Sequence, residues 1–285
     1  MWKVDLPDVG DIDDQLDAAL IHKDGTVAYH LTDAERLAVA TLYQGYDSLL
    51  GEPDPSLIPV TLDACKDALH TAYNEVQKKG RLSKLRGTLM AAVIECPLCG
   101  FEAATTLDHH LPKDDYRALS IYSRNLVPSC QPCNRAKGTL EPVAGKGMIH
   151  TYFQDIPDFT FLFAEAGYTA GSLVVTFRID PTLLPAGLSE RLKFQLHRLK
   201  LNNRYFDPIN IFLFNLKPSL RMFRGKPNEA ELIKAFFLAS ANSYDCDYGF
   251  NHWRAALMRC LATSDDFLAD PWSYLDKPLL SLKAG

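Results

Sequence analysis

Apolar residues recur at helical spacing along most of residues 1–94. Thr32 and Glu35 match the capping box that starts a helix, and the apolar positions after Glu35 keep the helical period. The glycine and prolines of 51–59 (GEPDPSLIP) are expected to end that helix. Two further helices are expected, over about 61–78 and about 82–94. The pattern therefore predicts a helical N-terminal region, residues 1–94.

The pattern changes in the centre of the chain. Residues 105–111 and 125–127 have the composition of short strands, and a helix is expected to open at Asn134. The aromatic stretch 149–156 (IHTYFQDI) is expected to pack back on this part of the chain. The order strand, connection, strand, helix predicts a small compact core within residues 95–160.

The last part of the chain is mixed. Residues 172–180 alternate and are rich in β-branched side chains, which predicts a strand. Helices are expected over about 188–201, 208–215, 228–243 and 251–262. Breaks between elements are expected at Pro181, Pro185, Pro218 and Pro227. Residues 161–285 are thus predicted to form a mixed, mostly helical C-terminal region, and the whole chain an α+β fold that is mainly helical.

The charge balance limits the possible partners. The net charge of −5 and a pI near 5.9 argue against a chain that coats nucleic acid over its whole surface. The basic stretches 78–86 and 191–204 could contact phosphate locally or could be solvated helix faces, and a partner subunit could supply the grip instead. No apolar run approaches the ~20 residues of a membrane span, and the acidic N-terminus lacks a secretory signal pattern. A cytoplasmic location without membrane contact is expected.

Four of the seven cysteines form two tight pairs. Cys96 and Cys99 are one Cys-x-x-Cys unit, and Cys130 and Cys133 are the other. In a chain expected to be cytoplasmic, such pairs indicate a metal rather than disulfides. Two units can supply the four sulfurs of a tetrahedral zinc site, and a closed four-cysteine site leaves no open coordination position. The spacing predicts a structural zinc ion that takes no part in chemistry.

An Asp–His pair lies between the two cysteine pairs. In a regular strand, the side chains of Asp108 and His109 would point to opposite faces, so they can serve one site only at a strand end or bulge. Asn134 begins the helix that is expected to pack across this strand. A carboxylate and an amide oxygen are suitable ligands for Mg²⁺ or Mn²⁺. Asp108 and Asn134 are therefore candidate ligands of a catalytic metal.

These residues resemble those of a known family. The segments D-H-H-L-P, N-L-V-P-x-C-x-x-C-N and C-P-x-C-G are similar to the HNH endonucleases, which have the ββα-metal (His-Me finger) fold. The positions that match the family's motif are His109, Asn125 and Asn134. The resemblance implies a one-metal phosphodiesterase in which His109 takes a proton from the attacking water. It also implies that Asp108 and Asn134 hold the metal, and that the side-chain oxygen of Asn125 accepts a hydrogen bond from the imidazole of His109.

Other polar residues near the motif have separate assignments. Lys113, Arg135 and Lys137 are candidates for contacts with the phosphate backbone, which position DNA without reading its sequence. His110 is assigned to packing, and His150 to the aromatic cluster or to a supporting role. The remaining histidines show no partner pattern: His22, His30, His70, His197 and His252.

A narrower resemblance suggests a biological role. The segments L-S-K-L-R, L-D-H-H-L-P-K and I-H-T-Y-F-Q-D are similar to HNH nucleases of bacterial antiphage defence, such as the nuclease subunit of Septu-type systems, which works with an ATPase partner. The resemblance implies a metal-dependent DNA endonuclease that acts with a partner such as an ATPase or sensor subunit. Two alternatives stay open: a modification-dependent restriction endonuclease, and a non-catalytic zinc module that binds nucleic acid or protein.

Overall fold

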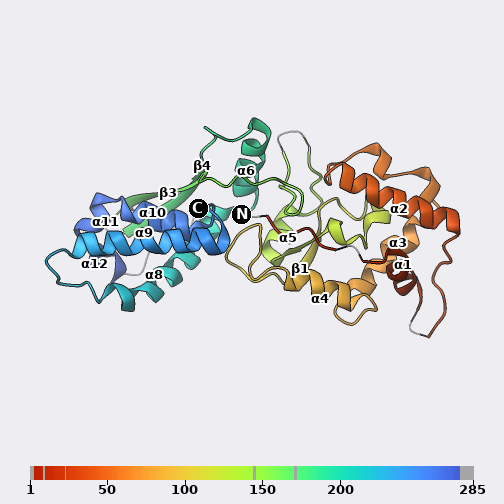
Figure 1. Ribbon diagram of the computed structural model, residues 1–285, viewed down its shortest axis with the longest axis horizontal. Helices are drawn as coiled ribbons and strands as arrows, with labels where there is room; N and C mark the ends of the chain where they lie inside the picture. The colour runs from red at the N-terminus through yellow and green to blue at the C-terminus, as the bar shows by residue number, and fades with distance from the viewer. Residues whose placement is uncertain (1–2, 9, 23, 144–145, 170–171, 277–285) are drawn as a thin grey trace. The chain divides into compact units, whose positions relative to one another are not determined.

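The computed structural model describes residues 3–8, 10–22, 24–143, 146–169 and 172–276. The chain divides into an N-terminal unit, Lys3–Asp155, and a C-terminal unit that begins at Ile156 (Figure 1). Each unit has its own buried side chains and is described by itself. None of the helices in the described part of the chain is both long enough and apolar enough to cross a bilayer.

The N-terminal unit begins with a layer of helices. These are α1 (Ile12–Leu20), α2 (Asp33–Ser48), α3 (Lys66–Ala72) and α4 (Ser83–Ala91), with the 3₁₀ turns η1 (Pro55–Leu57), η2 (Val60–Leu62) and η3 (Tyr73–Val76). The predicted capping box is confirmed: the Thr32 hydroxyl accepts from the Glu35 backbone N–H at 3.2 Å, and the Glu35 carboxylate accepts from the Thr32 N–H at 2.8 Å. Helix α2 therefore starts where the capping residues predict.

The single helix expected over 61–78 is wrong. The structure divides this stretch into η2, α3 and η3. The apolar side chains that suggested one helix are nevertheless buried together, including Leu62, Leu69 and Val76. Tight 3₁₀ turns at both ends of α3 therefore keep the apolar face against the core while the backbone changes direction.

A ββα motif follows the helical layer. Strand β1 (Thr106–His109) pairs antiparallel with β2 (Leu126–Ser129), so that Asp108 lies opposite Val127 and His109 opposite Leu126. Helix α5 (Gln131–Lys137) packs against β1 (Figure 1). It begins three residues earlier than expected because the sulfur of Cys130 caps it, accepting from the Cys133 N–H at 3.4 Å. The predicted ββα core is confirmed.

One hydrophobic core joins the helical layer to the ββα motif. Val39 of α2, Leu69 of α3, Leu107 of β1 and Leu126 of β2 are all buried in the same cluster. The aromatic stretch also packs here, since Phe153 lies against this cluster and the Tyr152 hydroxyl donates to the Leu126 carbonyl at 2.9 Å. The helical layer and the motif therefore form one compact unit, and the division at residue 94 stays an interpretation of the sequence.

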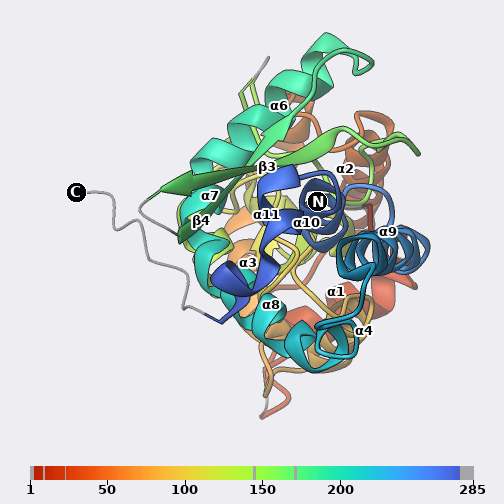
Figure 2. The ribbon, with the colours of Figure 1, turned by 90° about the vertical axis from the view of Figure 1, so that its left-hand side faces the viewer.

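The C-terminal unit contains a hairpin covered by helices. Strand β4 (Ser172–Ile179) is close to its prediction, whereas its antiparallel partner β3 (Leu162–Thr169) was not predicted. The helices are α6 (Ala186–Arg198), α7 (Leu201–Arg204), α8 (Phe206–Leu220), α9 (Glu229–Tyr248), α10 (Trp253–Ala262), α11 (Asp265–Ala269) and α12 (Pro271–Leu275). Helix α10 lies between β3 and α9 (Figures 1 and 2).

The break expected at Pro218 is also wrong. Pro218 lies inside α8, which continues to Leu220. Pro218 has no N–H to donate to the Phe214 carbonyl, but only two residues of α8 follow it, so the helix ends soon after the proline. Pro185 and Pro227, by contrast, lie outside the helices, immediately before α6 and two residues before α9.

A glycine at the end of α2 lies against the buried hydrogen-bond network of the N-terminal unit. Tyr46 in α2 has its hydroxyl 2.9 Å from Nε2 of His150. Gly51 has φ of 75°, and a Cβ there would lie 2.8 Å from the same Nε2. Any side chain at this position would therefore combine a left-handed backbone with a clash against a fully enclosed ring.

We expect Gly51→Ala to destabilise the N-terminal unit by about 3 kcal/mol, from left-handed strain plus the clash with His150. Gly25→Ala is the matched control, since Gly25 has φ of 83° but no atom within 4 Å of the added Cβ; it should cost about 1 kcal/mol. Urea unfolding followed by circular dichroism measures both. Equal losses of stability in the two variants would contradict the packing described here.

Candidate active site and metal centre

Four cysteine sulfurs converge at the base of the ββα motif. The Sγ atoms of Cys96, Cys99, Cys130 and Cys133 all lie within 4.8 Å of one another, and all four residues are buried. The Cys99 and Cys130 sulfurs are 3.8 Å apart. A tetrahedral zinc site with Zn–S bonds of about 2.3 Å has sulfurs about 3.8 Å apart, so this cysteine clamp fits a zinc ion.

The backbone around the cysteine clamp is shaped to present the sulfurs. Gly100 takes φ of 76° and donates its N–H to the Cys96 carbonyl at 2.8 Å, which closes the first turn. The second pair lies at the start of α5, with Cys130 as the cap. The clamp therefore joins the segment that leads into β1 to the helix that follows β2. Among the described residues, no other group of three His, Cys, Asp or Glu side chains is arranged to hold a metal.

The interface between β1 and α5 brings together the two candidate ligands of the catalytic metal. Thr106 and Asp108 are two residues apart and share one face of β1. Asn134 and Lys137 are three residues apart and share one face of α5. The Asn134 amide donates to the Thr106 hydroxyl at 3.2 Å, and the Lys137 ammonium lies 3.5 Å from the Asp108 carboxylate. These two contacts place Asp108 and Asn134 on the same interface.

The donor set at this interface fits a divalent cation. The Asn134–Thr106 hydrogen bond uses the amide nitrogen, whereas a cation would use the amide oxygen. Burial raises the pKa of Asp108 to about 6, and the Lys137 ammonium acts in the opposite direction. The lysine thus places a positive charge beside Asp108. A carboxylate and an amide oxygen are hard ligands of the kind that Mg²⁺ and Mn²⁺ prefer.

Lys137 does not lie where the sequence analysis placed it. It was expected to reach the DNA backbone, but only 3% of its surface is exposed. Its ammonium donates to the His109 carbonyl at 2.6 Å and pairs with Asp108. Since a surface contact would require an exposed ammonium, Lys137 can meet only a phosphate that enters the site itself.

The imidazole of His109 is held on the other side of β1. Its Nε2 lies 2.9 Å from the Ser120 carbonyl. A carbonyl only accepts, so Nε2 carries the hydrogen and Nδ1 keeps the lone pair. The Tyr73 ring packs edge-on at 4.4 Å between ring centroids. Burial lowers the pKa of His109 to about 4, so the imidazole is neutral at pH 7.

Asn125 is not the hydrogen-bond partner of His109, which corrects the expectation drawn from the resemblance. Its Oδ1 accepts from the Leu111 N–H at 2.8 Å, and its Nδ2 donates to the carbonyls of Leu111 at 3.1 Å and Leu119 at 3.3 Å. Asn125 is fully buried and ties the backbone of Leu111 to that of Leu119, the residue before Ser120. It therefore positions the carbonyl that orients His109 and does not orient the imidazole directly.

The two neighbouring histidines lie behind this loop. The Tyr46 hydroxyl donates to Asn125 Oδ1 at 3.1 Å and also lies 2.9 Å from His150 Nε2. The His110 and His150 rings pack against each other at 4.0 Å. Burial lowers the pKa of His150 to about 3. Both histidines lie in the packed interior, as expected for His110, and His150 supports Asn125 through Tyr46.

The remaining phosphate candidates differ in their surroundings. Arg135 is exposed on α5. The Lys113 ammonium lies 2.9 Å from His70 Nε2 and 3.0 Å from the Asp114 carboxylate. The sequence pattern indicated no role for His70, Tyr73 or Ser120. The three-residue spacing of His70 and Tyr73 does predict that both side chains lie on one side of a helical segment. It does not predict that this side faces His109.

The basic stretches are only partly available to a partner. Arg81 donates to the carbonyls of Ala18 and Ala19 at the end of α1, and Arg86 is buried and donates to the Thr105 carbonyl. These two arginines of 78–86 therefore have structural roles. In the C-terminal unit, Lys193 and Lys200 of 191–204 are exposed.

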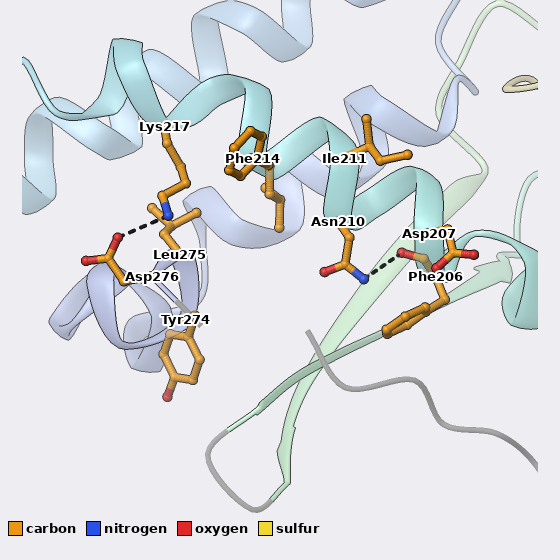
Figure 3. Close-up of a pocket in the computed structure, with 10 residues that line it drawn as sticks. Phe206, Asp207, Asn210, Ile211, Phe214, Lys217, Tyr274, Leu275 and Asp276 are labelled. Atoms are coloured by element: carbon orange, nitrogen blue, oxygen red, sulfur yellow. Dashed lines mark hydrogen bonds and ion pairs between the residues drawn. The ribbon is translucent and has the colours of Figure 1, made fainter. Parts of the chain in front are cut away.

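The C-terminal unit has a hollow of its own. Its volume is 590 Å³, and its walls come from α8 and the end of α12 (Figure 3). The Lys217 ammonium pairs with the Asp276 carboxylate at 3.1 Å inside it, and Ile211 and Phe214 are exposed (Figure 3). None of the predicted site residues lines this hollow, so it is separate from the site described above.

Comparisons with known proteins agree with the geometry. Residues 96–140 match the model of the HNH endonuclease family. The chain is similar to protein ea31 of Escherichia phage lambda, with 26% identity over 195 residues, covering 63% of this chain and 65% of that protein. It is also similar to the Septu protein PtuB of Bacillus thuringiensis, with 47% identity over 45 residues, covering 16% of this chain and 18% of that protein. No solved structure matches.

Residues 96–140 are therefore an HNH endonuclease domain, built on a ββα motif with a buried four-cysteine cluster. The chain spans less than two thirds of the length of each of these relatives. The match to the phage protein is much longer than the HNH segment, so similarity to that protein extends beyond the domain.

We expect the purified protein to contain about one zinc ion per chain, as one closed four-cysteine site requires. Cys130→Ser should lose the zinc and unfold the ββα motif, because Cys130 supplies both a ligand and the cap of α5. Elemental analysis and thermal unfolding measure the two effects. Cys246→Ser is the control, since Cys246 is exposed in the C-terminal unit. A folded Cys130→Ser protein that retains full stability would sink the structural-zinc assignment.

Proposed function

We propose that this protein is a metal-dependent endonuclease that hydrolyses phosphodiester bonds in DNA. The observation that carries the proposal is the state of His109: a neutral imidazole whose Nε2–H is committed to the Ser120 carbonyl, next to the interface that holds Asp108 and Asn134. A histidine with one nitrogen fixed and the other carrying a lone pair is suited to act as a general base.

In the proposed reaction, Nδ1 of His109 takes a proton from a water molecule aligned with the scissile phosphorus. The resulting hydroxide attacks the phosphorus, and the bond from phosphorus to the 3′ oxygen breaks. The 3′ oxygen leaves as an oxyanion and takes a proton from solvent. An anionic phosphate beside the imidazole would raise the pKa of His109 from its low value in the free protein. The Ser120 carbonyl supports the same change, because it stabilises the protonated ring.

Asp108 and Asn134 would hold a Mg²⁺ or Mn²⁺ ion, which would stabilise the negative charge on the phosphate and the leaving oxygen.

Lys137 has a different role in the proposed mechanism. Its ammonium is buried 3.5 Å from Asp108, so it stabilises the carboxylate while no cation is bound. It can then turn toward the phosphate when a cation takes its place beside Asp108.

The negative charge of the N-terminal unit indicates that this unit alone binds DNA weakly. Residues 3–155 hold 15 Lys and Arg against 22 Asp and Glu, a formal net charge of −7. A unit with this charge repels a polyanion except at local cationic groups, such as Arg135 and Lys113. The grip on DNA is therefore expected from the C-terminal unit or from a second protein.

We propose further that the nuclease serves antiphage defence with a partner such as an ATPase or sensor subunit. The similarity to a Septu protein supports this role. The alternatives are a modification-dependent restriction endonuclease and a non-catalytic zinc module. The presence of Asp108, His109 and Asn134 within one ββα motif argues against the non-catalytic module, since such a module needs none of them.

His109→Ala should lower the rate of DNA cleavage by about 10²- to 10⁴-fold, because the variant lacks the general base. The assay uses plasmid DNA with Mg²⁺ or Mn²⁺, with and without the products of neighbouring genes. His22→Ala is the control, since His22 is exposed. Cleavage by His109→Ala at the parent rate would overturn the mechanism.

The same variant tests the defence role in cells. Expression of the gene with its neighbours should reduce phage plaque formation, and His109→Ala should restore it. Cleavage that depends on His109 in vitro, combined with unchanged plaque formation, would support the nuclease and contradict the defence role. Cleavage confined to modified DNA would favour the restriction alternative.

A further inference from the structure

A cluster of three charged or titratable side chains lies at the edge of the candidate active site. His70 Nε2 is 2.9 Å from the Lys113 ammonium and 2.9 Å from the Asp114 carboxylate, and Lys113 is 3.0 Å from the same carboxylate oxygen. His70 comes from α3, whereas Lys113 and Asp114 come from the loop after β1. Two nitrogen groups thus share one carboxylate oxygen.

This cluster adjoins His109. His70 is three residues before Tyr73, whose ring packs edge-on against the His109 ring at 4.4 Å, so one side of α3–η3 faces the imidazole. Burial is the main cause of the lowered pKa of His109, and the charges of Lys113 and His70 add to it. Both groups are therefore within electrostatic reach of the imidazole.

The three side chains differ in solvent exposure, and the most exposed of them is the most easily displaced. The His70 side chain is 23% exposed and that of Lys113 is 34% exposed, whereas Asp114 is 60% exposed. Ion pairs at such exposure contribute little to stability. The carboxylate can therefore leave the two nitrogen groups at small cost, while His70 and Lys113 stay in place.

Open space lies beside the carboxylate. A hollow of 420 Å³ is lined by Asp114 together with three other aspartates, Asp63, Asp67 and Asp115. Two of these three are paired, Asp63 with Lys66 at 2.6 Å and Asp67 with Arg117. Asp114 can rotate into this hollow, and its departure would leave the Lys113 ammonium and the His70 imidazole next to the site.

We propose that His70 and Lys113 form a binding site for a backbone phosphate of the DNA substrate, and that the Asp114 carboxylate occupies this site until DNA displaces it. The choice of ligand rests on the proposed nuclease function. A carboxylate and a phosphate present similar anionic oxygens to N–H donors. The Lys113 ammonium is such a donor, and His70 Nε2 becomes one in the tautomer that carries its hydrogen toward the Asp114 oxygen. The site would hold the DNA strand beside His109, and Asp114 would compete with it.

The proposal is tested by DNA binding to the full chain carrying His109→Ala, which does not cut. Adding His70→Ala should raise the Kd for a short duplex about fivefold or more, because one donor to the phosphate is lost. Adding Asp114→Asn should lower the Kd about threefold or more, because the competing charge is gone. Fluorescence anisotropy at several salt concentrations measures these effects.

Two controls match these variants. Asp115→Asn removes the same charge from the neighbouring exposed position, so the effect of Asp114→Asn must exceed it. His22→Ala removes an exposed histidine elsewhere. If His70→Ala misfolds by circular dichroism, His70→Gln replaces it, with the same expected direction. A Kd unchanged by the His70 variant, or equal effects at Asp114 and Asp115, would overturn the proposal.

The outcome is separable from that of the nuclease proposal. A parent protein that does not cut DNA but shows these changes in Kd would contradict the nuclease function and support the phosphate site. A parent that cuts, with His70 and Asp114 variants that bind like their controls, would support the nuclease function and overturn the phosphate site.

Discussion

The cysteine clamp is the constraint on which the active-site geometry depends. Strands β1 and β2 have four residues each, and α5 has seven. Elements this short are unstable alone, because a two-stranded hairpin is marginal and a helix of this length is not stable by propensity. The clamp ties the segment before β1 to the first turn of α5. A zinc ion bound there would fix how α5 crosses β1, and this crossing brings Asn134 and Asp108 to one interface.

The site divides its functions between the two faces of β1. The face that carries Asp108 meets α5 and has the two proposed oxygen ligands and Lys137. The face that carries His109 meets Ser120 and Tyr73. Tyr73 and His70 belong to the helical layer, so this layer is part of the site as well as support for it. Asn125 lies between these parts and holds the loop that orients His109.

The sequence predicted the parts of the site whose residues are close together in the chain, and it did not predict contacts between distant segments. The cysteine pairs and the Asp–His pair lie at fixed spacings within one short segment, and the structure places the four cysteines together. Ser120 acts through its backbone carbonyl, and no residue type indicates that role. His70 and Tyr73 reach His109 only through tertiary packing. The expected hydrogen bond between Asn125 and His109 is absent because the Asn125 amide is hydrogen-bonded to the backbone of Leu111 and Leu119.

Strand β3 was not predicted because its glycine and alanine residues weaken the strand pattern of the sequence.

The central claim is that Asp108 and Asn134 hold the catalytic cation. The most direct measurement is anomalous diffraction from crystals of the protein soaked in Mn²⁺. We expect a manganese peak between the Asp108 carboxylate and the Asn134 amide oxygen, with the Lys137 ammonium moved away from Asp108. Manganese bound only elsewhere, with the Lys137–Asp108 pair intact, would contradict this assignment.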